Sequence, residues 1–315
     1  MILVLRALGV GDLATAVPAL RGLRTAFAGE TLALAAPAWL TPLIELIGGV
    51  DLVLSTSDLS PRAWPVEPPE VAVNLHGRGP ESHRLLMSVN PGELWAFANA
   101  DAGHPDGPLW IEEEHEVHRW SRLTGHYGAA ADWSDLSLRV PTHPVRRGLT
   151  IIHPGAKSPS RRWPASRYAT VAKTLADRGH RVVVTGSAPE IDLAGQVARG
   201  AGLPRAAVLA GRTGVGELAA LVAHARLVIS GDTGIAHLAT GYRTPSVVLF
   251  GPMPPSRWGP PPGRPYHRAL WHGSTAEPGD APGPGIHPAL LLISVDEVLA
   301  AAADVERARH AVAPQ

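Results

Sequence analysis

Short apolar runs alternate with segments of helical period along the whole chain. In the first half, apolar runs cover residues 2–8, 31–35, 52–54 and 71–75, and a helical stretch covers residues 13–27. In the second half, runs at 149–153, 181–185, 227–230 and 246–250 alternate with helical stretches at 165–178, 216–225 and 234–240. Alternation of this kind is typical of βαβ units. It predicts an α/β protein with mainly parallel sheets.

The alternation restarts after a segment that has no apolar period. Residues 140–148 contain two prolines and end in a glycine, as linkers often do. The restart predicts two similar Rossmann-like domains instead of one large sheet. The predicted limits are 1–145 for the first domain, 146–294 for the second, and 295–315 for a closing helix. A chain of 315 residues is long enough for two such domains.

Composition and charge mainly exclude classes of protein. Lys+Arg and Asp+Glu both number 28, so no net charge recruits nucleic acid or an anionic membrane. The chain has no cysteine, which rules out disulfides, iron–sulfur clusters and thiolate zinc sites. No apolar run approaches the roughly 18 residues of a membrane span, and no basic leader precedes the first strand. We therefore expect a cytoplasmic protein without a transmembrane segment.

The first turn has the pattern of a dinucleotide-binding site. Gly9-Val-Gly11-Asp-Leu-Ala14 follows a strand and opens a helix, as in G-x-G-x-x-G/A. An NAD-dependent dehydrogenase also needs an acidic residue at the end of the second strand, where this chain has Ala35-Ala36-Pro37. A carboxylate at position 12 would also repel a pyrophosphate. The dehydrogenase interpretation is therefore disfavoured.

Two roles for Asp12 remain open on the residues alone. An aspartate at the start of a helix commonly accepts backbone N–H groups as a cap. The same position, at the carboxyl end of the first strand, is where open α/β sheets bind ligands. Capping and catalysis are equally favoured.

The turn at residues 230–237 of the second domain carries a stronger signal. A buried strand leads into Gly231-Asp232-Thr233-Gly234, and a helix begins there with His237 in its first turn. A helix start offers unpaired N–H groups and a dipole that favours a diphosphate. A capping aspartate with a half-buried histidine is the alternative, and it is weaker because three polar groups converge on one turn.

A basic loop precedes that turn, at residues 153–164. It contains Lys157, Arg161 and Arg162 and two serines, Ser158 and Ser160. Arginine at a strand end can neutralise the charge on a departing nucleoside diphosphate. Clustered charge is more often a solvated loop, but the Trp-Pro pair at 163–164 indicates an anchored one.

Together these motifs resemble glycosyltransferase family 9, the ADP-heptose:lipopolysaccharide heptosyltransferases. The resemblance rests on the following motifs: Arg6-x-x-x-x-Gly11-Asp12, His153-Pro-Gly155, Arg161-Arg-Trp163-Pro164, Leu209-Ala-Gly211, Asp232-Thr-Gly234-x-x-His237 and Leu249-Phe-Gly251-Pro252. It implies a GT-B fold, in which two Rossmann-like domains face each other across a central cleft and the C-terminal helix packs back on the first domain. The implied reaction is inverting and metal-independent, and it uses no cofactor. It moves heptose or a related sugar from an ADP-sugar to an acceptor hydroxyl.

The resemblance also implies roles for individual residues. Asp12 would be the general base, and Arg161 stands where the family has a phosphate-binding lysine. Asp232 would hold sugar hydroxyls. The other donor-binding residues that it implies are Gly11, Ser158, Ser160, Arg162, Gly186, Ser187, Thr213, Thr233, Gly234 and His237. One departure is Gly251-Pro-Met253-Pro-Pro255, where the family usually has Gly-Pro-Thr-Asp-Pro.

The acceptor side is predicted at the end of the strand at 71–75. Asn74, His76 and Arg78 lie there and are the predicted acceptor-binding residues, although a simple polar loop is an equally good interpretation. The first 148 residues contain no lysine and an acidic run at 112–114. Beside a lipopolysaccharide-core-like glycolipid, a small soluble natural-product acceptor therefore stays open.

Two further functions stay open beside glycosyl transfer. A hydrolase or epimerase of the same fold would act on a nucleotide sugar without an acceptor. A non-catalytic protein would only bind the sugar nucleotide. The presence of both Asp12 and Asp232 argues against the last of these.

Overall fold

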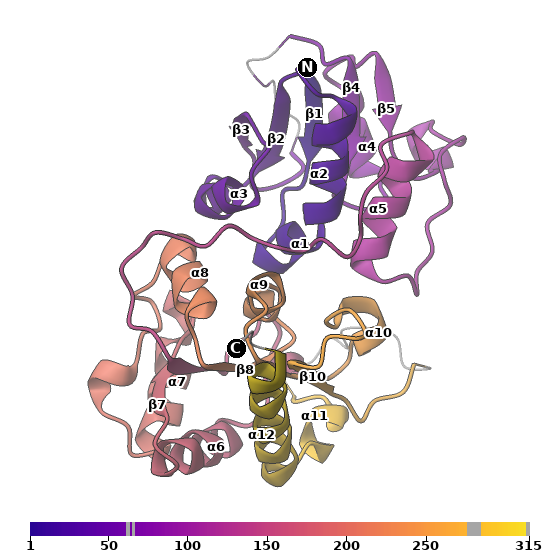
Figure 1. Ribbon diagram of the computed structural model, residues 1–315. Helices are drawn as coiled ribbons and strands as arrows, with labels where there is room; N and C mark the ends of the chain where they lie inside the picture. Colours follow the sequence, from indigo (N-terminus) through magenta and orange to yellow (C-terminus); the bar gives the residue numbers. More distant parts are fainter. Residues whose placement is uncertain (61–63, 65–66, 276–284, 313–315) are drawn as a thin grey trace. The chain divides into compact units, whose positions relative to one another are not determined.

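The computed structural model describes residues 1–60, 64, 67–275 and 285–312, and the chain forms two compact units (Figure 1). The first unit is Met1–Arg139 and the second is Val140–Gln315. Residues 140–148, the predicted linker, contain no helix or strand.

The first unit contains a parallel sheet with the strand order β3-β2-β1-β4-β5. Its strands are β1 (Ile2–Leu5), β2 (Leu32–Ala36), β3 (Leu52–Ser55), β4 (Val71–Asn74) and β5 (Glu93–Trp95). Its helices are α1 (Val10–Thr15), α2 (Val17–Ala26), α3 (Thr41–Ile47), α4 (Glu81–Met87) and α5 (Glu116–His126). The order of connections reverses between β1 and β4. In open α/β sheets such a switch point is where ligands bind.

The second unit repeats this plan with the strand order β10-β9-β8-β6-β7, again parallel throughout (Figure 1). Its strands are β6 (Leu149–His153), β7 (Arg181–Val184), β8 (Leu227–Gly231), β9 (Ser246–Leu249) and β10 (His267–Leu270). Its helices are α6 (Ala165–Asp177), α7 (Ile191–Gly200), α8 (Val215–Ala223), α9 (Gly234–Tyr242), α10 (Pro255–Trp258), α11 (Pro288–Leu292) and α12 (Val295–Val312). The switch point lies between β6 and β8. The prediction of two parallel, Rossmann-like sheets is confirmed.

The helix predicted at 13–27 is in fact two helices, α1 and α2, which meet at Ala16. Pro18 lies in the first turn of α2, where its missing N–H is tolerated. Farther into an unbroken helix, a proline would remove a backbone hydrogen bond. The edge strands β5 and β10 were not predicted from the sequence. β5 has only three residues, and β10 begins with two polar residues, so neither forms an apolar run.

The C-terminal helix α12 packs on the second sheet. Val298, Ala302 and Val305 are almost fully buried in the same core as β8 and β9, and α12 also contacts α6 and β10. Their spacing of four and then three residues forms one apolar stripe along the helix. The expectation that the helix also packs back on the first domain stays a prediction.

We expect Val298→Ala to lower the free energy of unfolding by about 1–3 kcal/mol, because it leaves a cavity against the second sheet. Hydrogen exchange should show faster exchange of the β8 and β9 amides and unchanged exchange in β1. Asp304→Ala, on an exposed position of the same helix, is the control and should change stability by less than about 0.5 kcal/mol. Equal effects on β1 and β8 would contradict the assignment of α12 to the second unit.

Candidate functional site

The turn after β1 places Asp12 at the switch point of the first unit. Gly9 caps α1, and Asp12, in the first turn of that helix, accepts the Gly9 N–H at Oδ2 over 3.1 Å. Its Oδ1 has no hydrogen-bond partner among the described residues. Asp12 therefore caps the helix through one oxygen and keeps the other available. The two roles that the sequence left open are compatible.

Arg6 lies directly beneath this turn and is 1% exposed. Its Nε and Nη2 donate to the Asp12 carbonyl over 2.9 and 2.6 Å, and its Nη1 donates to the Leu75 carbonyl. Burial lowers the pKa of Arg6 to about 10, an effect that the charge of Asp12 opposes. Arg6 belongs to one of the sequence motifs, but the sequence predicted no role for it.

His76 follows β4 on the other side of the same switch point. Leu5 of β1 pairs with Asn74 of β4, and the Leu75 carbonyl is held by Arg6, so His76 lies beside the Asp12 turn. Its Nδ1 is buried without a hydrogen-bond partner in the described part of the chain. Burial lowers the pKa of His76 to about 4; the charge of Arg6 lowers it further, and that of Asp12 opposes both. The imidazole is neutral at pH 7.

The other two predicted acceptor residues lie in different surroundings. Asn74 is fully buried, and its amide donates to the Gly77 carbonyl, Ser82 Oγ and His83 Nδ1 over 2.9–3.2 Å. Its Oδ1 accepts the His76 N–H. Asn74 therefore shapes the loop, and its role in acceptor binding stays a prediction. Arg78 is exposed on the same loop.

In the second unit, the predicted donor residues gather at the carboxyl ends of β6 and β8. His153 of β6 pairs with Ser230 of β8, so the two loops leave the sheet side by side. Arg161 Nη1 lies 3.2 Å from Asp232 Oδ2, and the Asp232 side chain is 6% exposed. The structure thus joins the two predicted motifs by an ion pair. A Cβ on Gly231 would lie 3.2 Å from the Arg161 carbonyl, so the glycine permits this approach.

Helix α9 starts at this edge with hydroxyls that have no partner. Thr233 is its N-cap residue but makes no side-chain capping bond, and Thr233 Oγ1 is buried without a hydrogen-bond partner in residues 1–60, 64, 67–275 and 285–312. The same holds for Ser230 Oγ. Gly234 is the first residue of the helix, and His237 in its first turn contacts Trp258 edge to face at 5.9 Å. A helix start with an unused hydroxyl is suited to an anion.

The basic loop is anchored, as its Trp-Pro pair predicted. Trp163 is 1% exposed, and its indole N–H donates to the Ile293 carbonyl over 3.2 Å. Ser158 Oγ and Ser160 Oγ lie 2.7 Å apart and bond to each other, and Ser160 is buried. Arg162 Nε donates to the Ala156 carbonyl. These contacts hold Arg161 over the end of β8.

Glu190 is a residue of this edge that sequence reasoning missed. Its Oε2 accepts the Ser187 N–H and hydroxyl, each over 2.7 Å. Burial alone would raise the pKa of Glu190, but these hydrogen bonds and the nearby His153 outweigh it, and the net shift is downward. A Cβ on Gly155 would lie 2.2 Å from the Glu190 carboxyl carbon, so the glycine leaves room for it. The only sequence signal was the Ser-x-x-Glu capping box at 187–190.

The remaining predicted residues line the neighbouring loops. Gly186 accepts the Gly211 N–H at its carbonyl over 2.9 Å, which brings the end of β7 against the loop that precedes α8. Thr213 is half-buried in that loop, and Gly11 is half-buried in the turn before Asp12. No hydrogen bond of the Thr213 side chain is found within the described residues, and the roles of Thr213 and Gly11 stay predictions.

The family model for glycosyltransferase family 9 (heptosyltransferase) matches residues 120–277, about half of the chain. The chain belongs to glycosyltransferase family 9. Over 132 residues it is 32% identical to lipopolysaccharide heptosyltransferase 3 of Escherichia coli, an alignment that covers 41% of this chain and 39% of the relative. The alignments span 30–39% of the length of the seven matched curated relatives.

Solved structures of the family share the fold over nearly the whole chain. The E. coli ADP-heptose lipopolysaccharide heptosyltransferase II superposes with a TM-score of 0.76 at 21% identity, covering 98% of this chain and 99% of that one. An E. coli heptosyltransferase solved with ADP-2-deoxy-2-fluoro heptose gives 0.68 at 17% identity, covering 95% and 98%. These likenesses confirm the expected GT-B class of fold for this family 9 protein.

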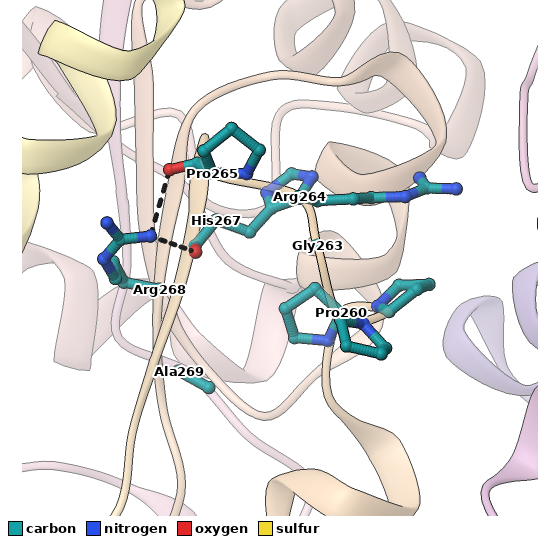
Figure 2. Close-up of a pocket in the computed structure, with 9 residues that line it drawn as sticks. Pro260, Gly263, Arg264, Pro265, His267, Arg268 and Ala269 are labelled. Carbon is teal, nitrogen blue, oxygen red and sulfur yellow. Dashed lines mark hydrogen bonds between the residues drawn. The ribbon is translucent and has the colours of Figure 1, made fainter.

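This family 9 protein also has a pocket away from the predicted site residues. The pocket, of about 460 Å³ in the second unit, is lined by residues 260–265 and 267–269. Figure 2 shows these residues, with Arg268 Nη1 donating to the carbonyls of Pro265 and His267. Within the part of the chain that is described, no helix is long and apolar enough to cross a membrane. Nor do three or more potential metal ligands gather there.

The low pKa of His76 predicts a pH dependence of stability. An unfolded histidine titrates near pH 6.5, whereas folded His76 takes a proton only near pH 4. Between these values the unfolded state binds more protons, so stability falls as the pH drops from 6.5 to 4. The melting temperature, measured from pH 6.5 to pH 4, reports this loss of stability. We expect it to fall less steeply in His76→Gln than in the wild type. His143→Gln, at an exposed position of the 140–148 segment, should leave this decline unchanged; equal slopes in all three proteins would contradict the prediction.

Proposed function

We propose that this family 9 protein is an inverting, metal-independent glycosyltransferase that moves heptose from ADP-heptose to a hydroxyl of a lipopolysaccharide core. The observation that carries the proposal is the start of α9, where the buried Thr233 hydroxyl has no hydrogen-bond partner in the described chain, next to the Arg161–Asp232 ion pair. In this proposal the second unit binds the donor and the first binds the acceptor.

The diphosphate of the donor would bind at the N-terminus of α9. The backbone N–H groups of its first turn and the Thr233 hydroxyl supply donors, and the helix dipole favours negative charge. Arg161 adds a planar guanidinium suited to bidentate phosphate contact. These groups would take up the charge of the departing ADP, which is the work a metal ion does in other enzymes.

The nucleoside and the sugar would bind on either side of this diphosphate. Glu190 presents an ionised carboxylate beside Gly155, and carboxylates at this edge of a Rossmann-like sheet commonly hold ribose hydroxyls. Asp232, already oriented by Arg161, has the acceptor oxygens that sugar hydroxyls need. Glu190 extends the predicted donor set, to which Asp232 already belongs.

Asp12 would act as the general base. One of its oxygens is held by the Gly9 N–H, which orients the carboxylate, and Oδ1 can accept the proton of the attacking hydroxyl. A single displacement at the anomeric carbon, with no covalent intermediate, inverts its configuration. His76, neutral and next to this turn, would contact the acceptor.

The matched relatives are lipopolysaccharide heptosyltransferases, which favours a lipopolysaccharide-core acceptor over the small soluble acceptor that the acidic run at 112–114 left open. The direct test is to incubate the protein with ADP-heptose and a deacylated, heptose-free lipopolysaccharide core and to follow ADP release and product mass. Glycosylated core supports the proposal. Sugar release or isomerisation with the donor alone would instead show a hydrolase or epimerase, and tight ADP binding without turnover on any acceptor would show a binding protein.

Asp12→Asn should lower kcat about 10²–10⁴-fold, the usual loss when a general base is removed. The amide keeps an oxygen that can still accept the Gly9 N–H, so the turn and the Kd for ADP should change less than about twofold. Steady-state kinetics and calorimetry measure the two quantities. Turnover within a factor of three of wild type would exclude Asp12 as the base.

Thr233→Val should weaken ADP binding about 10–100-fold, since a hydrogen bond to a charged group contributes roughly 1.5–3 kcal/mol. Thr240→Val, at the other end of α9, is the matched control. Its hydroxyl donates to the Ala236 carbonyl within the helix. Calorimetry should find the control unchanged; equal weakening in both variants would mean that the loss comes from the helix and not from the diphosphate contact.

A further inference from the structure

Arg6 is a buried cation whose guanidinium donates hydrogen bonds to α1 and to the loop after β4, at the switch point of the first unit. It follows β1 directly and is 1% exposed. Two of its nitrogens donate to the Asp12 carbonyl, and a third donates to the Leu75 carbonyl, one residue before His76. One guanidinium thus connects the turn that carries Asp12 to the loop that carries His76.

Neighbouring side chains fix the position of this guanidinium. Thr15 Oγ1 accepts from Arg6 Nη2 over 3.1 Å and donates to the same Asp12 carbonyl over 2.9 Å. Trp120 lies 4.5 Å from the guanidinium carbon, and its indole N–H is held by Glu116. Thr15 and Trp120 are each 1% exposed. Movement of Arg6 would therefore disturb the core and both loops at once.

The charge of Arg6 persists in this environment. Burial lowers its pKa to about 10, so the group is still protonated at neutral pH. A buried cation without a carboxylate in direct contact is costly, and its main compensation here is hydrogen bonding to two backbone carbonyls. An apolar residue at position 6 would leave the Asp12 and Leu75 carbonyls without these donors.

We propose that Arg6 is a positioning residue for the transfer reaction, one that sets the place of the Asp12 carboxylate and of His76 by holding the main chain behind both. This rests on the proposed role of Asp12 as the base. Arg6 acts through the backbone and touches no substrate. Its loss displaces the base, and a displacement of about 1 Å can cost 10²-fold in rate.

The planar fork of arginine is needed for this arrangement. Lysine keeps the charge but has a single nitrogen, which cannot reach both carbonyls and Thr15 in the observed geometry. We expect Arg6→Lys to lower kcat about 10–100-fold in the assay with ADP-heptose and deacylated core. The KM for ADP-heptose should stay within about twofold, because the donor residues belong to the second unit.

Arg119→Lys is the matched control. Arg119 is also 1% exposed, stacks on Trp110 at 4.0 Å and pairs with Glu116, and its Nη2 donates to three carbonyls of the loop at 111–114. Its replacement should lower the melting temperature by a similar amount while kcat stays within about threefold. Equal losses of kcat in both lysine variants would overturn the proposal in favour of a general role in stability.

A second, milder variant covers the case in which Arg6→Lys does not fold. Thr15→Val removes only the hydroxyl that links Arg6 to the Asp12 carbonyl, and Thr15→Ser restores it. We expect a 3–10-fold fall in kcat for valine and recovery to within about twofold for serine. Unchanged kcat in the valine variant would overturn the proposal.

A double-mutant cycle separates this proposal from the proposed function. If Arg6 acts through the Asp12 carboxylate, Arg6→Lys should lower kcat less than threefold in the Asp12→Asn background. Full additivity of the two losses would overturn the positioning role and leave Asp12 as the base. Near-wild-type activity of Asp12→Asn alone would overturn the proposed base, whatever the Arg6 variants do.

Discussion

Both candidate sites depend on one constraint: backbone groups that leave a parallel sheet lose their ladder partners and must find others. Buried N–H and C=O groups that stay unpaired cost free energy comparable to a lost hydrogen bond. At the carboxyl ends of β1, β4, β6 and β8, the chain turns away from its neighbours inside a packed interior. The side chains that satisfy these groups are the ones that shape each site.

The two units meet this constraint in opposite ways. In the first unit, side chains of the protein pair with the backbone groups beyond the strand ends. Arg6 donates to the carbonyls of Asp12 and Leu75, and the Asp12 carboxylate accepts the Gly9 N–H. In the second, the Thr233 hydroxyl at the start of α9 remains without a partner in the described chain. The bonds of Arg6 fix the backbone of the Asp12 turn, whereas the unused hydroxyl at the start of α9 favours a ligand that brings its own acceptor atoms.

A carboxylate that caps a helix can also keep an oxygen available for chemistry. The Asp12 carboxylate caps α1 with one oxygen, and this bond orients the other. At Asp232 an ion pair with Arg161 orients the carboxylate in the same way. In both places a group that stabilises local structure also holds a charged oxygen at the switch point of a sheet, where open α/β folds bind their ligands.

The sequence by itself determined the repeated α/β plan, the restart near residue 149 and the chemical character of the two main turns. Apolar period, glycine turns and charged strand ends are local signals, so they can be read from neighbouring residues. The tertiary structure alone decided what depends on contacts between distant segments. It broke the first helix at Ala16, buried Asn74 within its loop, placed α12 on the second sheet, and brought Arg6 and Glu190 into the sites. The partners of these side chains lie far along the chain: Leu75 is 69 positions from Arg6, and Asp232 is 71 positions from Arg161. No local pattern of residues records such pairings.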